Sequence, residues 1–370
     1  MVYTCAQMRI ASHHRPQPSY SPLLTRLFSV LIFSGAAALF LISAAQAAPV
    51  HARVKHLLIY SIDVEGGQST LLVAPSGASL LVDTGWPGNS GRDAMRIEQA
   101  MHDASITKID HVFITHYHVD HVGGLPGLIQ HVQVGEFIDH GPNREDSDFM
   151  RRDYAAYLKA IAGKPHRVVH PGDTVNIPGL NIVVLAADGE HIAAVPGIKP
   201  QPNPYCATER KWDADPTENA RSAGFLLRFG KFSFLDLGDL TGAKEVALVC
   251  PNNPIGHVDL YLVDHHGMNL SNSRALVDAI HPRVAIMNNG AHKAGSPEAW
   301  QTVHDSPGMQ DLYMLHTAEG SDAAHNSADP LIANLKGSSD GSYFKVVASA
   351  DGSFSVTNTR TGQTKNYSGK

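Results

Sequence analysis

The sequence predicts an α/β protein in which two sheets pack face to face with helices on the outside, in one domain. Two observations lead to this prediction. The chain has 370 residues, of which 43% are hydrophobic and 17% charged, so it can bury a large core. In both halves, short apolar runs of strand-like composition alternate with stretches of helical spacing, and Gly and Pro mark the breaks between them.

The first half opens on three apolar runs, over residues 56–62, 69–73 and 79–82, which predict a meander of strands. Met95, Ile97 and Met101 then recur at near-helical spacing with charged residues between them. The elements expected next are a helix over 93–104, a strand over 110–114, a helix over 125–131, a strand over 134–139, a helix over 148–162, and a hairpin of strands over 174–177 and 181–185.

Residues 188–218 are rich in Pro, Gly and polar residues. Thirty residues are long for a connection, so we interpret this segment as a lid or an insertion at the edge of a site. The second half then repeats the alternation of strands and helices. Its expected elements are strands over 224–229 and 232–237, a helix over 243–249, a strand over 258–263, a helix over 273–280, and a strand over 284–287.

Residues 1–47 are interpreted as a signal peptide. They contain three arginines and no acidic residue, and the apolar run 27–42 is followed by an Ala-x-Ala end at Ala47. The alternative is an uncleaved membrane anchor, but the run is short for a span. Cleavage would leave a single domain over residues 48–370, periplasmic or secreted, with no stable membrane anchor.

The mature chain is acidic. Without the leader, 26 Lys and Arg face 35 Asp and Glu, a formal net charge of −9. A broad basic face for nucleic acid is therefore not expected, although a metal pair would add local positive charge. A small molecule is the expected substrate. Cys206 and Cys250 remain after cleavage, and an exported pair suggests one disulfide, the alternative being two buried thiols.

Four potential metal ligands fall within six residues after the apolar strand that ends at Ile114. They are His116, His118, Asp120 and His121. In an extended loop, alternate side chains share a face, so the first two can hold one ion while the other two turn toward a second. Asp83 ends another apolar strand on a Gly turn, where its carboxylate could orient a ligating histidine or serve as an ordinary turn residue.

Several motifs, taken in order, resemble the metallo-β-lactamase superfamily. They are Asp83-Thr84-Gly85, the 115–124 segment, Gly238-Asp239 and His265-His266-Gly267. Within that superfamily the sequence is similar to the competence branch of nuclease-like DNA-uptake domains and phosphorylcholine esterases. The resemblance implies an αββα sandwich with two divalent metal ions, expected to be Zn²⁺, at one edge between the sheets.

The resemblance also implies a ligand set. His116 and His118 would hold the first ion, and Asp120, His121 and His265 the second, with Asp239 bridging both. Asp120 and Asp239 would also be catalytic, because they would orient a metal-bound hydroxide that attacks the substrate. Adjacent residues usually point to opposite sides, so His265 is preferred as a ligand and His266 is expected to form the site wall.

The third ligand of the first ion has two candidates. His191 follows the 181–185 strand, where superfamily members usually place this ligand. His140 also ends a strand on a Gly turn, where functional side chains commonly lie, and it is preferred. Lys293 and His316 lie beside strand ends and could line a pocket, although ordinary turn chemistry would explain them equally well.

Two departures from the competence branch concern the substrate. The chain reads Asp63-Val64-Glu65-Gly66-Gly67-Gln68 where that branch has Asp-Val-Gly-Gln-Gly-Asp, and Ser296-Pro297 where it has His-Pro. The expected function is exported, metal-dependent hydrolysis of a phosphodiester or phosphorylcholine-type ester. The alternatives are hydrolysis of a lactone, thioester or β-lactam, and a metal-binding protein without turnover.

Overall fold

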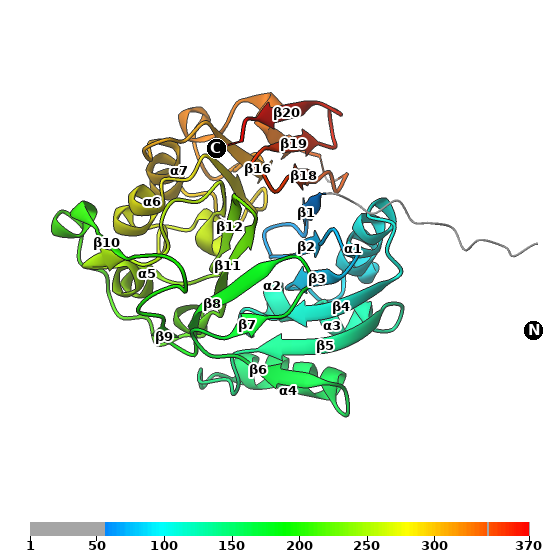
Figure 1. The fold of residues 1–370 in the computed structure, drawn as a ribbon. Helices are drawn as coiled ribbons and strands as arrows, with labels where there is room; N and C mark the ends of the chain where they lie inside the picture. The colour runs from blue at the N-terminus through cyan, green and yellow to red at the C-terminus, as the bar shows by residue number, and fades with distance from the viewer. Residues whose placement is uncertain (1–55, 339, 370) are drawn as a thin grey trace, which may run out of the picture. The chain divides into compact units, whose positions relative to one another are not determined.

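Two large mixed sheets dominate the computed structural model, which describes residues 56–338 and 340–369 (Figure 1). By their contacts, the described residues form one compact unit. The predicted signal peptide lies outside the described residues. Between residues 56 and 369, no described helix has both the length and the apolar character needed to cross a bilayer.

The first sheet contains the amino-terminal half of the fold and the last three strands. Its order is β20-β19-β18-β1-β2-β3-β4-β5-β6, antiparallel from β20 to β3 and parallel from β3 to β6. The strands are β1 (Leu57–Ser61), β2 (Thr70–Val73), β3 (Ser79–Val82), β4 (Lys108–Phe113), β5 (Gln133–Asp139), β6 (His166–Val168), β18 (Phe344–Ala348), β19 (Phe354–Asn358) and β20 (Thr364–Tyr367).

The second sheet has the order β17-β16-β15-β14-β12-β11-β8-β7, with the short β9 also paired to β8. The strands from β12 to β17 are parallel. The strands are β7 (Thr174–Val175), β8 (Asn181–Ala187), β9 (Glu190–His191), β11 (Gly224–Phe229), β12 (Phe232–Asp236), β14 (Leu260–Leu262), β15 (Val284–Met287), β16 (Asp311–His316) and β17 (Ile332–Asn334); β10 (Gln201–Pro202) pairs separately with β13 (Asn252–Asn253).

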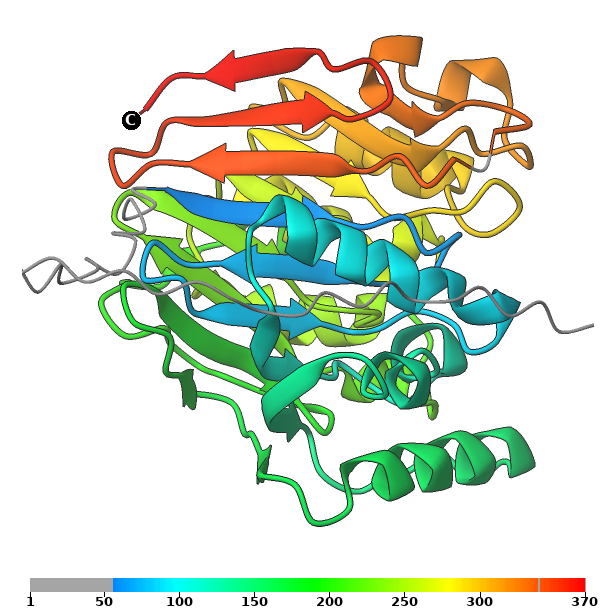
Figure 2. The ribbon, with the colours of Figure 1, turned by 90° about the vertical axis from the view of Figure 1, so that its right-hand side faces the viewer.

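Helices cover the outer face of each sheet. On the first sheet, α1 lies across the strands β1 to β3, as Figure 2 shows. The helices on this side are α1 (Arg92–Asp103), α2 (Val119–Val122), α3 (Leu125–Leu128) and α4 (Asp148–Ile161); those on the second sheet are α5 (Gly242–Val249), α6 (Arg274–Ile280) and α7 (Pro297–His304). The result is four layers, αββα.

Three apolar clusters hold these layers together. One lies between the sheets, where Phe113 of β4 meets Phe225 of β11 edge to face at 5.4 Å. Such an aromatic pair adds about 0.5–1.5 kcal/mol beyond the area it buries. Each of the other two clusters lies between one sheet and the helices that cover it. They include Ile97 of α1 and Leu276 of α6. Because both faces of the sheets are covered, many strands are apolar throughout.

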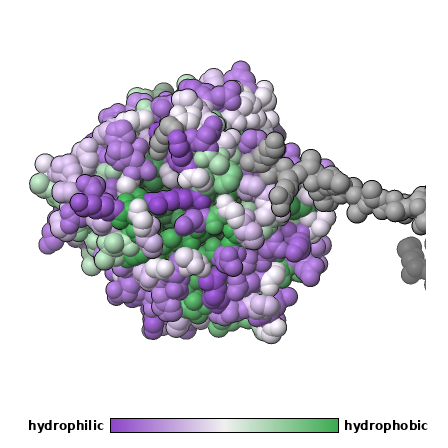
Figure 3. Space-filling view, in the orientation of Figure 1, coloured by the Kyte–Doolittle hydropathy of each residue, from purple (hydrophilic) through white to green (hydrophobic). Residues whose placement is uncertain are grey.

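Hydrophilic side chains cover most of the face drawn in Figure 3, and the hydrophobic surface gathers toward its middle. The large apolar side chains that are exposed include Phe149, which is 69% exposed on α4, and Leu270, which is 52% exposed. Isolated exposed apolar residues are normal on a soluble protein, so only those that border a cavity call for an explanation.

The structure confirms the predicted fold class, the opening meander and the 174–185 hairpin. The strands over 79–82, 224–229 and 284–287 have the predicted bounds, and the other predicted elements differ from their prediction by one to three residues at one end or both. The sequence analysis missed α7 and all of the strands beyond residue 310. Of these, β18 pairs with β1 and so joins the two ends of the fold.

Candidate metal centre

Polar side chains gather where the parallel strands of the two sheets end. Asp83 follows β3, the His116–His121 segment follows β4, Asp239 follows β12, and His265 and His266 follow β14. Of the candidate ligands among them, His118 is 24% exposed and the others are buried. An apolar strand that ends on a polar loop brings its last side chains to the sheet edge, and here the edges of both sheets contribute to one cluster.

The backbone at residues 265 and 266 is unusual. Both histidines have left-handed φ angles, 53° for His265 and 55° for His266, within the short helical turn Asp264–Gly267. Non-glycine residues rarely adopt this conformation, and runs of two suggest a functional constraint. The turn also brings both imidazoles to Asp239. The expectation that only His265 faces the site is therefore wrong, because that rule applies to extended chain.

Four side chains come close enough to hold one ion. They are Asp120, His121, Asp239 and His266, whose potential ligand atoms all lie within 4.8 Å of one another. Nε2 of His266 is 3.1 Å from Nε2 of His121 and 3.3 Å from Oδ2 of Asp120. The sequence analysis placed His266 in the wall of the site, whereas the structure places it among these four.

Further nitrogens surround the Asp239 carboxylate. Its Oδ2 lies 3.2 Å from Nε2 of His121, 3.5 Å from Nε2 of His265 and 3.9 Å from Nε2 of His116, which in turn lies 3.0 Å from Nδ1 of His118. The His266 imidazole approaches the other oxygen of Asp239, Oδ1, at 3.4 Å. Asp239 thus contacts imidazoles from both the 116–121 segment and the 265–266 turn, as a ligand shared by two ions would.

Hydrogen bonds orient the histidines. Nδ1 of His121 lies 2.7 Å from Oδ2 of Asp83, and the Thr115 backbone N–H and hydroxyl donate to the same carboxylate at 2.8 and 2.7 Å. Because the carboxylate accepts the Nδ1 proton, Nε2, which points into the cluster, is the nitrogen left to bind a cation. The predicted contact between Asp83 and a ligating histidine is thus present.

The other rings are held in a similar way. Nε2 of His118 lies 3.1 Å from Oε2 of Glu145, which leaves Nδ1 to face the cluster. Nδ1 of His265 lies 3.2 Å from the Ser271 hydroxyl. Carboxylate and hydroxyl partners of this kind fix the tautomer and orientation of metal-binding histidines. No pattern in the sequence identified Glu145 or Ser271, which lie in loops.

The electrostatics of the cluster suit a cation. Burial lowers the pKa of His116 well below its usual value and lowers that of His265 to about 4, so both rings are neutral at pH 7. Burial alone would raise the pKa of Asp239, but the surrounding imidazoles hold it well below its usual value. Its Oδ1 has no hydrogen-bond partner in the described chain. Burial would lower the pKa of His121, but Asp239, Asp120 and Asp83 raise it well above its usual value, so this ring would release a proton on binding a cation. Imidazoles and ionised carboxylates together form a ligand set that fits divalent metal ions.

Lys293 reaches the rim of this cluster from the loop after β15. Its Nζ pairs with Oδ2 of Asp120 and lies 4.9 Å from the centre of the Trp86 ring. The side chain is 32% exposed, so it borders solvent while touching a candidate ligand. The sequence analysis named Lys293 as a pocket residue, with turn chemistry as the alternative; the structure places it at the site.

Neither candidate for the missing ligand joins the cluster. His140 is buried, but its Nε2 lies 3.0 Å from Oε2 of Glu218, and among the described residues it belongs to no metal-binding group. The preference for His140 is therefore not supported as a ligand assignment. His191 is exposed on the two-residue strand β9. His140 follows a strand as predicted, whereas the strand that contains His191 was not predicted. The end of a strand does not by itself determine which way a side chain points.

A second group of potential metal ligands, Asp63, Glu65 and His316, lies nearby. Its side chains already contact one another and Arg96. Oδ2 of Asp63 accepts from Arg96 at 2.9 Å, and its Oδ1 lies 2.7 Å from Nε2 of His316. Arg96 also contacts Glu65 at 3.3 Å. With a guanidinium and an imidazole neutralising these carboxylates, we interpret this group as an ion-pair network.

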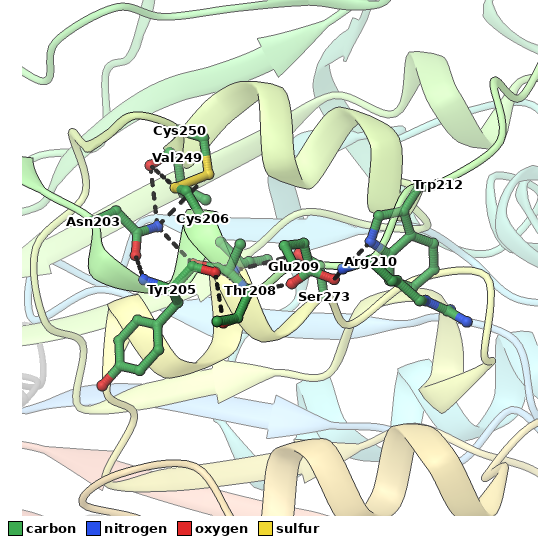
Figure 4. The surroundings of a disulfide bond; sticks show 12 residues. Asn203, Tyr205, Cys206, Thr208, Glu209, Arg210, Trp212, Val249, Cys250 and Ser273 are labelled. Atoms are coloured by element: carbon green, nitrogen blue, oxygen red, sulfur yellow. Dashed lines mark hydrogen bonds between the residues drawn. A yellow bond between two sulfur atoms is a disulfide. The ribbon is translucent and has the colours of Figure 1, made fainter.

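The 188–218 insertion is anchored beside the cluster. The structure contains the Cys206–Cys250 disulfide that the sequence left open, with Cα atoms 5.9 Å apart. Figure 4 shows Glu209 between this disulfide and Trp212. The Glu209 carboxylate accepts a hydrogen bond from Trp212 Nε1 at 3.0 Å and another from the backbone N–H of Ala275, in the first turn of α6, at 2.6 Å. The prediction of an insertion at the edge of the site is confirmed, because Asn219, just beyond it, lies 3.4 Å from Nε2 of His265.

Comparisons with known proteins agree with this geometry. Residues 63–202 match the model of the metallo-beta-lactamase superfamily. Recombination protein 2 of Haemophilus influenzae is 24% identical over 232 residues, which are 62% of this chain and 24% of that protein. Ribonuclease Z of Methanopyrus kandleri is 33% identical over 121 residues, 32% of this chain and 39% of that protein. The chain thus aligns with less than half of either relative.

Among solved structures, the metallo-beta-lactamase fold protein YhfI from Bacillus subtilis covers 70% of this chain and 96% of its own, at 10% identity and a TM-score of 0.42. The ligand motif that follows β4 lies inside the matched residues 63–202, and the αββα layers agree with the fold of that family. Over residues 63–202, the chain is thus similar to the metallo-β-lactamase superfamily.

Proposed function

We propose that this protein is an exported hydrolase that uses two divalent metal ions to cleave a phosphoester. One observation carries the proposal: four imidazoles, those of His116, His121, His265 and His266, converge on the buried carboxylate of Asp239 at the edge where the two sheets meet. Together with His118 and Asp120, which adjoin them, they supply more donors than one tetrahedral ion takes. Histidine and carboxylate ligands suit zinc, and the ligand set does not depend on cysteine.

The cluster divides into two half-sites. Asp120, His121 and His266 would hold one ion together with Asp239. His116 and His118 would hold the other. His265, whose Nε2 lies 3.5 Å from Oδ2 of Asp239, would supply the third ligand of this ion in place of His140 or His191. The metal pair supplies a water nucleophile that is activated near neutral pH and positive charge for a substrate oxygen.

The protein's own residues orient the reaction. Asp83 and Glu145 hold two imidazoles in the tautomers that present lone pairs to the cluster. Asp120 touches both the cluster and Lys293, so it can align the attacking water. Lys293 places a half-buried ammonium at the rim, where it can donate to an anionic oxygen of the substrate. A phosphodiester carries such an oxygen.

Two further observations support the proposal. The name of the relative ribonuclease Z indicates phosphodiester hydrolysis. The Cys206–Cys250 disulfide supports export, since such bonds persist mainly in oxidising compartments. Thioester hydrolysis is the second candidate, because another relative, 29% identical over 108 residues, is named thioesterase pkgB of Emericella nidulans.

The substrate class can be tested with purified zinc-loaded protein and three chromogenic substrates: a phosphodiester, a thioester and nitrocefin. We expect turnover of the phosphodiester to exceed that of the other two. We also expect Lys293→Met to raise KM for the phosphodiester about tenfold or more, because a charge-assisted hydrogen bond contributes about 1.5–3 kcal/mol. Lys336→Met is the matched control, since Lys336 is 77% exposed.

Faster turnover of nitrocefin or the thioester would overturn the phosphoester assignment and leave the metal site intact. Full metal content without turnover of any of the three would favour a metal-binding protein without catalysis.

A further inference from the structure

A cavity of about 410 Å³ lies beside the metal centre, between the carboxyl-terminal part of the insertion and the start of α5. Its walls include residues 210–217, Asn219, Thr241 and Leu270. Two of these link it to the cluster: Asn219 lies 3.4 Å from Nε2 of His265, and Thr241 follows Asp239 by two residues. A group attached to a phosphorus at the metal centre can therefore extend into this cavity.

Two buried polar side chains of this wall have unused hydrogen-bonding capacity. Within the described residues, Oδ1 of Asn219 and Oγ1 of Thr241 have no partner, although these residues are only 8% and 3% exposed. Thr241 occupies the N-cap position of α5, where a hydroxyl normally accepts a backbone N–H, yet its side chain makes no such bond. Buried polar groups are rarely left unpaired, so a bound ligand is a natural partner for both.

The wall of the cavity is already fixed in place. The Trp212 ring packs against Gly242, where an added Cβ would lie 2.3 Å from a ring carbon. The Arg210 guanidinium stacks on the same ring at 3.6 Å and donates to the Asn269 carbonyl at 2.8 Å. Figure 4 shows Arg210 and Trp212 on the segment that Glu209 and the disulfide anchor. The cavity is thus preorganised, which reduces the ordering cost of binding.

The chemistry of the lining indicates what would bind there. Lys211 and Asp213 bring one charge of each sign, and Arg210 and Asp215 add another such pair, so the cavity favours neither anions nor cations. Leu270 is 52% exposed and offers an apolar surface for a carbon skeleton. A neutral group that carries hydroxyls on a short carbon chain complements this combination of apolar wall and unpaired amide and hydroxyl.

We infer that this cavity is a subsite for a neutral polyhydroxylated substituent of the phosphoester, such as a glycerol or sugar unit, bound through Thr241 and Asn219. The inference rests on the proposed phosphoester hydrolysis and specifies its substrate. Asn219 also touches a candidate metal ligand, so Thr241 is the residue to vary. Thr241→Val removes the hydroxyl at nearly constant shape, and Thr241→Ser retains it.

The kinetic test compares two phosphodiesters with the same 4-nitrophenyl leaving group, one with a glyceryl and one with a propyl substituent. Zinc-loaded wild-type protein should favour the glyceryl ester in kcat/KM by about tenfold, the size of effect expected from one or two hydrogen bonds. Thr241→Val should reduce this ratio several-fold, mainly through KM, and Thr241→Ser should restore it. A sugar-phosphate ester in a third arm separates the two sources of hydroxyls. A wild-type ratio near one, or a ratio unchanged in Thr241→Val, would overturn the inference.

A binding measurement separates this inference from the proposed function. The chain has three tryptophans, so the indole N–H signal of Trp212 can be assigned by NMR with Trp212→Phe. Glycerol 3-phosphate should shift this signal more than propyl phosphate does, and Thr241→Val should abolish the difference. If the Trp212 signal shifts in this way but the protein hydrolyses no phosphodiester, the subsite stands and the proposed reaction is rejected. If both probes shift the signal equally, the subsite is rejected. Because the hydroxyl has no partner, Thr241→Val should not lower Tm; a lower Tm would mark the hydroxyl as structural and contradict the inference.

Discussion

Replacing Asp239 with alanine is expected to reduce phosphodiester hydrolysis by well over about a hundredfold and to lower the metal content of the protein. Removing a residue that only orients a metal ligand typically costs 10–100-fold, and Asp239 would contact both ions directly. Its two oxygens lie within 3.5 Å of His121, His265 and His266. Without this carboxylate, the imidazoles lose the negative charge that balances a cation pair.

The measurement is kcat/KM together with metal content, for the variant and for Asp305→Ala as a matched control. Asp305 is exposed at the end of α7, far in sequence from every candidate ligand, so its removal should change neither quantity. Circular dichroism and Tm establish that both variants fold. If Asp239→Ala kept full metal content and full activity, Asp239 would not be a bridging ligand.

Loss of the Cys206–Cys250 disulfide is expected to lower the free energy of unfolding by about 4 kcal/mol. The bond closes a loop with a sequence separation of 44 residues, and the chain-entropy model assigns about this value to a loop of that length. The double variant Cys206→Ser/Cys250→Ser isolates the effect, because the structure shows no other disulfide among the described residues. Its insertion should also exchange amide hydrogens faster around residues 203–217.

Urea denaturation with and without reductant measures this prediction. Reductant should shift the wild-type midpoint to that of the double variant and leave the double variant unchanged. Equal midpoints for oxidised wild type and double variant would show that the bond does not stabilise the fold. Because Glu209 and Trp212 anchor the same segment independently, we expect the variant to remain folded at 25 °C.

Local patterns are enough to predict most of the fold before residue 290, because strands buried on both faces read as apolar runs and α1 has one apolar face. The carboxyl-terminal strands differ. Residues 344–348 alternate buried and half-buried positions, as a strand should, but their partner β1 begins at residue 57. Nothing in the pattern of β18 specifies that pairing, so the sheet to which it adds cannot be inferred from sequence alone.

The candidate site was also predicted only in part from the sequence. The 116–121 cluster and Asp239 were identified by spacing and resemblance, and the structure brings them together. The choice of His265 over His266 failed because it assumed extended backbone, whereas both residues have positive φ. The preference for His140 failed because its ring turns toward Glu218, a partner 78 residues away in sequence. Side-chain direction at a strand end depends on such distant partners.

The central claim is that the side chains around Asp239 hold two divalent ions. Elemental analysis by plasma mass spectrometry of purified protein, loaded with zinc and freed of excess metal by gel filtration, tests it most directly. The structure predicts two zinc ions per chain for the wild type and fewer in His121→Ala and His118→Ala, each of which removes a ligand from one half-site. Less than one ion per chain in the wild type, or an equal metal content in all three proteins, would contradict the claim.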